Sequence, residues 1–183
     1  KGSTPHGIFL KTLKGEKDTA VIKELITALT GVKRKTVICT FIRMAALHAE
    51  PGVRKAANWA VNECPHTLLR KCIAKLFHPE DETLCRYLIT KIGELQITGC
   101  GQMVSSFLHP NTPVPLKYAS LESLCLLKDK KYLPLLIPYI TSSDPMEAYL
   151  GTLAAAKSVS TLDECKELRD IFLSSAPEKE VLK

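Results

Sequence analysis

The chain has 183 residues, of which 45% are apolar and 24% charged, a composition typical of a folded globular protein and not of a disordered one. It has no apolar run of about 18 residues or more, so no transmembrane helix is predicted. The formal net charge is +6, and residues 1–100 carry 16 Lys+Arg against nine Asp+Glu. Any basic surface is therefore expected in that half, where it would bear on partners rather than on fold.

Apolar residues at steps of three and four, interrupted by short polar turns with proline, predict a chain made of helices. No segment alternates in the manner of a strand over a useful length. In chain order, helices are expected near 6–14, 18–30, 34–49, 52–63, 66–77, 82–96, 98–108, 113–127, 131–141, 145–159 and 162–174. A further helix is expected to begin near Glu178.

The turns recur at a nearly constant interval. The apolar residues that precede them are separated by 30, 31, 32 and 33 residues, and they are Leu47, Phe77, Leu108, Ile140 and Leu173. A period of this size is typical of stacked helix pairs, in which each pair buries its apolar sides against its neighbours. The expected fold is all-α, an α-solenoid of about six antiparallel helix pairs. It would form a single domain over residues 6–183 or part of a longer array, with residues 1–5 outside the fold.

Local capping chemistry supports the helix starts. Asp144 is expected to cap the helix that begins at Pro145, with Glu147 in its first turn. Thr112 and Pro113 are expected to repeat that arrangement.

Three segments carry a resemblance to a known superfamily, and they span 51–57, 132–140 and 144–148. Their proline-containing turns and small-residue helices resemble the HEAT repeat, especially the short phycobilisome-lyase-like class. The resemblance covers residues 30–175. It implies a HEAT-like α-solenoid whose second helices line a concave surface, and it leaves the function open because such arrays serve many roles.

A shorter resemblance concerns residues 53–63, which are similar to a helix of the HEAT-like alkylpurine DNA glycosylases. Trp59 matches a tryptophan that helps to hold the damaged nucleotide in that family. The family's catalytic aspartate and its second tryptophan have no counterpart here, so this resemblance implies at most DNA binding.

A column of mostly basic residues is expected on the second helices. Its members fall at similar levels of successive pairs, and they are Arg54, Lys55, Arg86, Lys117 and Tyr149. Such a ladder could follow phosphates or an acidic partner helix. In the alternative interpretation these are solvated charges, paired with Glu50, Glu82 or Glu122.

Two further features are candidates for partner contact. Lys33, Arg34 and Lys35 lie where a helix is expected to begin, a place where the helix macrodipole disfavours cations. They could contact nucleic acid or an acidic protein, or lie in a solvated loop. Trp59 could be an exposed binding anchor or partly buried packing.

Metal and cofactor sites are not expected. Histidines occupy three equivalent turns, at His48, His78 and His109, but neighbouring helices lie about 8–10 Å apart, much farther than metal–nitrogen bonds of about 2.0–2.1 Å allow. A role in capping the turns is expected instead. The cluster of Cys64, His66 and Cys72 lacks a fourth ligand at the spacing of a zinc site.

The sequence therefore predicts a non-catalytic scaffold that binds a helix or segment of a partner protein on its second-helix surface. It has no Gly-rich phosphate loop and no Gly-x-Ser-x-Gly elbow. One alternative is nucleic-acid binding by the basic half. Another is a lyase-like enzyme with a reactive thiol at Cys64, Cys72 or Cys85. Seven cysteines without a disulfide-type spacing favour a cytoplasmic location, and no membrane partner is expected.

Overall fold

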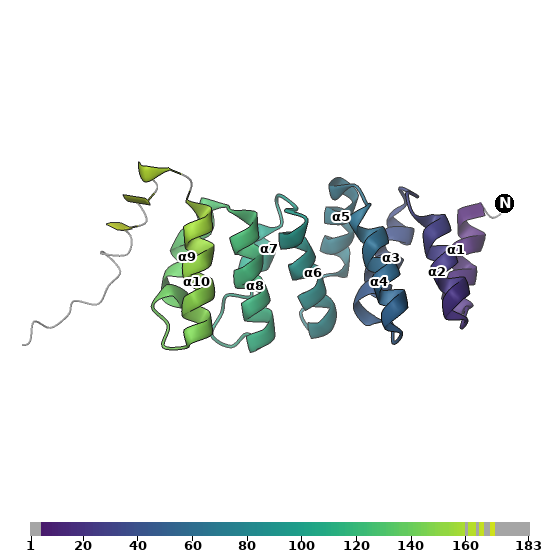
Figure 1. Ribbon diagram of the computed structural model, residues 1–183, viewed down its shortest axis with the longest axis horizontal. Helices are drawn as coiled ribbons and strands as arrows, with labels where there is room; N and C mark the ends of the chain where they lie inside the picture. The colour runs from purple at the N-terminus through teal and green to yellow at the C-terminus, as the bar shows by residue number, and fades with distance from the viewer. Residues whose placement is uncertain (1–4, 160, 164, 167–168, 171–183) are drawn as a thin grey trace, which may run out of the picture. The chain divides into compact units, whose positions relative to one another are not determined.

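The computed structural model describes residues 5–159, 161–163, 165–166 and 169–170. Within these residues the chain is all-helical, with ten α-helices, one short 3-10 helix and no strand (Figure 1). The chain divides into two compact units, Lys1–Leu88 and Ile89–Lys183. Each unit is described by itself.

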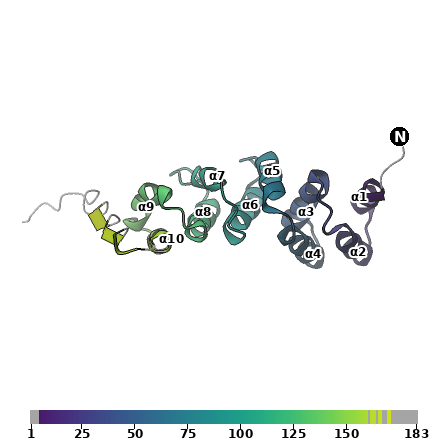
Figure 2. The ribbon, with the colours of Figure 1, turned by 90° about the horizontal axis from the view of Figure 1, so that it is seen from above.

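The first unit consists of helices in two layers. Its helices are α1 (Pro5–Gly15), α2 (Thr19–Leu29), α3 (Lys35–Leu47), α4 (Pro51–Asn62), α5 (His66–Leu76) and the first half of α6 (Glu82–Glu94). Within successive pairs, α1 packs on α2 and α3 on α4; along the layers, α2 packs on α4 and α3 on α5 (Figure 2). First helices therefore form one layer of this unit and second helices the other.

The first unit is held together by apolar stripes that face between these layers. On α3, Ile38, Phe41 and Ile42 recur at the spacing of one helix face, and each is at most 1% exposed. Ile26 of α2 and Leu69 of α5 are buried in the same way. Truncating a buried Phe to Ala typically costs about 3–5 kcal/mol, so Phe41 is expected to contribute strongly to the stability of the unit.

The second unit contains the rest of α6 followed by α7 (Gly101–Ser105), α8 (Val114–Leu127), the 3-10 helix η1 (Lys130–Tyr132), α9 (Leu133–Ile140) and α10 (Pro145–Ser158). Helix α8 packs against α7 and α10, and α9 packs against α10. Gly151 permits the close approach of the last two, because a Cβ there would lie 2.9 Å from the backbone nitrogen of Ile140. Ser123 Oγ donates a 2.9 Å hydrogen bond to the carbonyl of Ile89, so this buried hydroxyl is satisfied.

Most helices begin and end within a few residues of their expected positions, but two differ. The helix expected at 98–108 is reduced to Gly101–Ser105. Gln96 and Gly99 have φ values of 48° and 81°. A right-handed helix cannot continue through these left-handed conformations, so α7 begins only after them. The helix expected at 131–141 is divided into η1 and α9.

One predicted helix cap is confirmed and one is wrong. Asp144 accepts hydrogen bonds from the N–H groups of Met146 and Glu147, with Pro145 as the first residue of α10. Thr112, by contrast, donates its own backbone N–H to the carbonyl of His109 in a preceding turn. Helix α8 therefore begins one residue later than expected, with Pro113 at the cap position. The expected helix at 162–174 is described only in part, and the one near Glu178 lies outside the described residues.

Candidate functional site

The second helices of the first unit carry an exposed aromatic side chain and two exposed cations. Lys55 and Trp59 lie one turn apart on α4, and Arg86 lies on α6. Trp59 is 50% exposed, and both cations are exposed. We call Lys55, Trp59 and Arg86 the second-helix surface. Because half of the residue's surface remains exposed, Trp59 is available to a partner.

The second-helix surface is held by a side-chain hydrogen bond between its two helices. Tyr87 donates its hydroxyl to Asn58 Oδ1 at 2.9 Å, and these residues are the chain neighbours of Arg86 and Trp59. Lys55 and Arg86 form no ion pair with any other residue in the described part of the chain. Within this unit, the expected pairing of Lys55 and Arg86 with Glu50 or Glu82 is thus not formed.

Arg54 has a different environment from its neighbour Lys55. Its Nη1 donates to the carbonyls of His48 and Ala49, both at 2.7 Å, so the guanidinium closes the turn between α3 and α4. His48 contributes to the same turn, because its Nδ1 accepts the N–H of Glu50 at 3.2 Å. The position predicted to bind a partner is therefore used within the chain.

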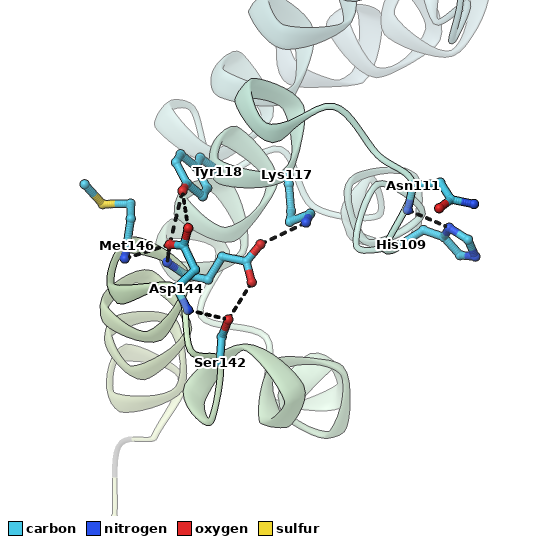
Figure 3. A network of polar contacts seen from close by, with 8 residues as sticks. His109, Asn111, Lys117, Tyr118, Ser142, Asp144 and Met146 are labelled. Carbon is cyan, nitrogen blue, oxygen red and sulfur yellow. Dashed lines mark hydrogen bonds and ion pairs between the residues drawn. The ribbon is translucent and has the colours of Figure 1, made fainter.

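The expected turn-capping role of the histidines is confirmed at two of three positions. Besides His48, the Nδ1 of His109 accepts the N–H of Asn111 at 3.3 Å (Figure 3). At His78 the backbone takes this role instead: its carbonyl accepts the N–H of Asp81 and the thiol of Cys85, each at 3.0 Å.

Lys117 of the second unit lies in an ion pair with little exposure to solvent. Its Nζ is 2.8 Å from Glu147 Oε1, and the two side chains are 12% and 15% exposed. Ser142 donates to the other carboxylate oxygen at 2.8 Å (Figure 3). The hydrogen bond from Lys117 lowers the pKa of Glu147 and raises that of Lys117 itself. The ion pair joins α8 to the first turn of α10, so this lysine is not a free cation of the predicted ladder.

A second hydrogen-bonded group adjoins this ion pair. Asp144 accepts the N–H groups of Met146 and Glu147, both at 2.9 Å, and the hydroxyl of Tyr118 at 3.2 and 3.3 Å (Figure 3). The N–H of Glu147 is the main cause that lowers the pKa of Asp144. The capping residue of α10 therefore also fastens that helix to α8.

Tyr149 is the one member of the predicted column in the second unit that remains open to solvent, at 61% exposed. It lies on the face of α10 that also carries Thr152, Leu153 and Ala156, beside a hollow of about 430 Å³. The column is thus interrupted within the second unit, because Lys117 is paired and Tyr149 is not a cation.

A hollow of the first unit lies on the opposite layer from the second-helix surface. It has a volume of about 530 Å³, and it runs along α3 between the last turns of α1 and α5. We call it the α3 groove. Its cations are Lys14, Lys35, Arg43 and Lys75. Its aliphatic and sulfur side chains are Cys39, Met44, Leu47 and Leu76.

Sequence reasoning singled out Lys35 but missed the rest of the α3 groove. Lys33, Arg34 and Lys35 are all exposed at the start of α3, and Arg34 holds the cap position without a capping side-chain hydrogen bond. The available signal was the four-residue spacing of Lys35, Cys39 and Arg43, which places them on one helix face.

The cysteines are free thiols, and the three proposed as reactive are disfavoured as nucleophiles. Burial raises the pKa of Cys64 to about 11 and that of Cys72 to about 12. The pKa of Cys85 is also raised by burial. Since the thiolate is the nucleophile, little of it is present at neutral pH. The described residues contain no group of three or more His, Cys, Asp or Glu that could hold a metal ion.

Comparison with the models of known protein families and with curated protein sequences gives no match. Over the described residues, none of the helices combines the length and the apolar character that a membrane-crossing helix needs.

Proposed function

We propose that this protein is a non-catalytic binding protein of the HEAT-like class, an α-solenoid of helix pairs that binds a helix or an extended segment of a partner protein. The observation that carries the proposal is the second-helix surface, which comprises half-exposed Trp59 and the exposed cations Lys55 and Arg86, neither of them ion-paired within the described residues. The recurrent helix pairs and the period of 30–33 residues support the class.

The chemistry of the second-helix surface suits a protein contact. Tryptophan and arginine are enriched among the side chains that carry binding energy, and removing such an anchor typically costs about 2 kcal/mol or more. Exposed cations at the rim mainly accelerate association with an acidic partner and select against basic ones. We therefore expect Trp59 to set the dissociation rate and Lys55 with Arg86 to set the salt dependence.

The test compares the partners retained by two baits. Wild-type protein and the variant Lys55→Glu, Arg86→Glu are immobilised and challenged with the same extract. A matched variant with the same charge change away from this surface, Lys17→Glu, Arg70→Glu, serves as control. We expect a stoichiometric protein that wild type and the control retain and the first variant loses.

The partner found in this way is then titrated into the protein while tryptophan fluorescence is recorded. The chain has a single tryptophan, so an emission change that is lost with Trp59→Phe reports on Trp59 itself. Equal recovery of every retained protein by all three baits would refute the proposed surface.

The charge of the first unit favours nucleic acid as a second candidate. Residues 1–88 contain 15 Lys+Arg against eight Asp+Glu, and Lys33, Arg34 and Lys35 are exposed there. Fluorescence anisotropy of labelled duplex and single-stranded DNA at about 50 and 200 mM salt tests it, because phosphate contacts are lost steeply with salt. Tight binding at low salt, with an affinity that falls by orders of magnitude at the higher salt concentration, would identify nucleic acid and not a protein as the partner. Absence of binding at both concentrations would exclude this candidate.

A further inference from the structure

We propose that the α3 groove is a second binding site of the first unit, and that its ligand is an acidic amphipathic helix of another protein. This goes beyond the proposed function, because the site is formed by the first helices and shares no residue with the second-helix surface. Four features carry it: the length of the groove, its apolar floor, its cations and a lining without Phe, Tyr or Trp.

The groove has the dimensions of a helix-binding site. Its lining follows one face of α3 from Lys35 to the cap residue His48. The helix has 13 residues, which at about 1.5 Å per residue gives a floor of about 20 Å. A partner helix of three to four turns matches that length. The volume of about 530 Å³ lies within the range of about 300–1,000 Å³ seen for binding pockets, enough for several inserted side chains.

The floor is apolar and adaptable. Leu47 is 48% exposed, and Met44 is half-buried beside it. An exposed leucine gains free energy when a partner covers it, at about 25 cal/mol per Å² of apolar area. Methionine side chains adapt to different partners because they are flexible and polarizable. Cys39, half-buried on the same face, adds a small thiol to the floor.

The charge around this floor has one sign. The lining contains Lys14, Lys35, Arg43 and Lys75 and no aspartate or glutamate. All four are exposed, and none is ion-paired within the described residues. Four like charges around one hollow repel each other when it is empty. A helix with carboxylates along its flanks removes that repulsion while its apolar face meets Met44 and Leu47.

The composition favours a peptide over nucleic acid at this site. Single strands are held by stacking of bases on aromatic side chains, and the groove lining contains no Phe, Tyr or Trp. Recognition of an amphipathic helix needs instead a hydrophobic groove that receives apolar side chains at i, i+3, i+4 and i+7. The aliphatic floor with cations at its borders meets that need.

The test uses a fluorescein-labelled helical peptide of about 15 residues, with leucines at i, i+3, i+4 and i+7 and glutamates elsewhere. A second peptide of the same composition has its leucines distributed around the helix. Binding is measured by anisotropy with the full chain. We expect the first peptide to bind in the micromolar range and the second at least tenfold more weakly.

Variants then locate the binding. The double variant Arg43→Glu, Lys75→Glu is expected to lower the affinity for the first peptide at least tenfold. The variant Leu47→Ser is expected to lower it severalfold. The matched control Lys17→Glu, Arg70→Glu changes the charge equally at exposed cations outside both the groove and the second-helix surface and is expected to stay within twofold of wild type. The affected side chains are exposed, and circular dichroism of each variant checks that the fold is retained.

A second readout does not depend on substitution. Bound peptide is expected to slow alkylation of Cys39, which lines the groove, and to leave that of exposed Cys165 unchanged. Equal binding of both peptides would overturn the proposal, as would equal affinity of the groove variant and the control variant. Tighter binding of an oligonucleotide that displaces the peptide would assign the groove to nucleic acid instead. Self-association that Leu47→Ser abolishes would assign it to a second copy of this chain.

Discussion

Replacing Lys117 with methionine is expected to destabilise the protein by about 2 kcal/mol, although this lysine was a candidate for partner binding. The substitution keeps the aliphatic stem and removes only the ammonium group that meets Glu147 at 2.8 Å. A lysine that served only a partner would tolerate the change without loss of stability. The free energy of unfolding therefore separates a structural role from a binding role.

The magnitude follows from the burial of the ion pair. Exposed ion pairs contribute about 0.2–1 kcal/mol, whereas hydrogen bonds to charged groups with little solvent contribute about 1.5–3 kcal/mol. With side chains 12% and 15% exposed, the Lys117–Glu147 pair belongs near the middle of the second range. Glu147 keeps only the hydrogen bond from Ser142 in the variant. A loss of about 2 kcal/mol corresponds to a decrease of about 4–8 °C in Tm for a chain of this length.

The assay is urea unfolding followed by far-UV circular dichroism at pH 7, for wild type, Lys117→Met, Glu147→Gln and the double variant. We expect a coupling energy of about 1–2 kcal/mol from this cycle. The control is Lys166→Met, because the Lys166–Asp163 pair is 54% and 90% exposed and its loss should leave the midpoint unchanged. A coupling energy below about 0.5 kcal/mol would refute the structural role of Lys117.

The remaining predictions concern pH, packing and thiol reactivity. The pKa of Glu147 is lowered in the folded state. Its contribution to the free energy of unfolding is therefore complete above its unfolded pKa of about 4.3 and is lost as pH falls through the folded value. Urea unfolding at pH 7 and at about pH 3 should show that the loss of stability caused by Glu147→Gln is smaller in acid. Gly151→Ala should destabilise by about 1–3 kcal/mol in the same assay, because the new Cβ would lie 2.9 Å from the nitrogen of Ile140. Burial raises the pKa of Cys72 to about 12. Its thiol should therefore react with iodoacetamide at pH 8 at least about a hundredfold more slowly than exposed Cys165, as measured by peptide mapping. A comparable rate at the two thiols would contradict the burial of Cys72.

Local chemistry explains why the helices could be predicted from the sequence. Asp144, followed by a proline and then a glutamate in the first turn, carries its capping information within four residues, and the structure confirms it. The failure at Thr112 is also local: a turn closed by its N–H to His109 shifts the start of α8 by one residue. The shortening of α7 depends on Gln96 as well as Gly99, and a left-handed glutamine is not apparent from sequence pattern.

The candidate sites could be predicted only in part, since residue type does not reveal a partner in space. Lys55 and Arg86 were identified by their repeat position and are exposed as expected. Lys117 occupies the same kind of position, but it meets Glu147, a residue 30 positions later in the chain. Arg54 likewise turns back to the carbonyls of His48 and Ala49. Equivalent positions of the sequence repeat therefore carry cations in different environments, exposed at Lys55 and Arg86 and ion-paired at Lys117.

An all-helical chain with a repeating turn follows from the sequence alone, because helix periodicity, prolines and capping residues act within one or two turns of each other. Which cations stay exposed and where a hollow forms depend on tertiary packing. The α3 groove takes Lys14, Arg43 and Lys75 from three different helices. Their proximity depends on how those helices pack, and packing is set by buried side chains far from the charges in sequence.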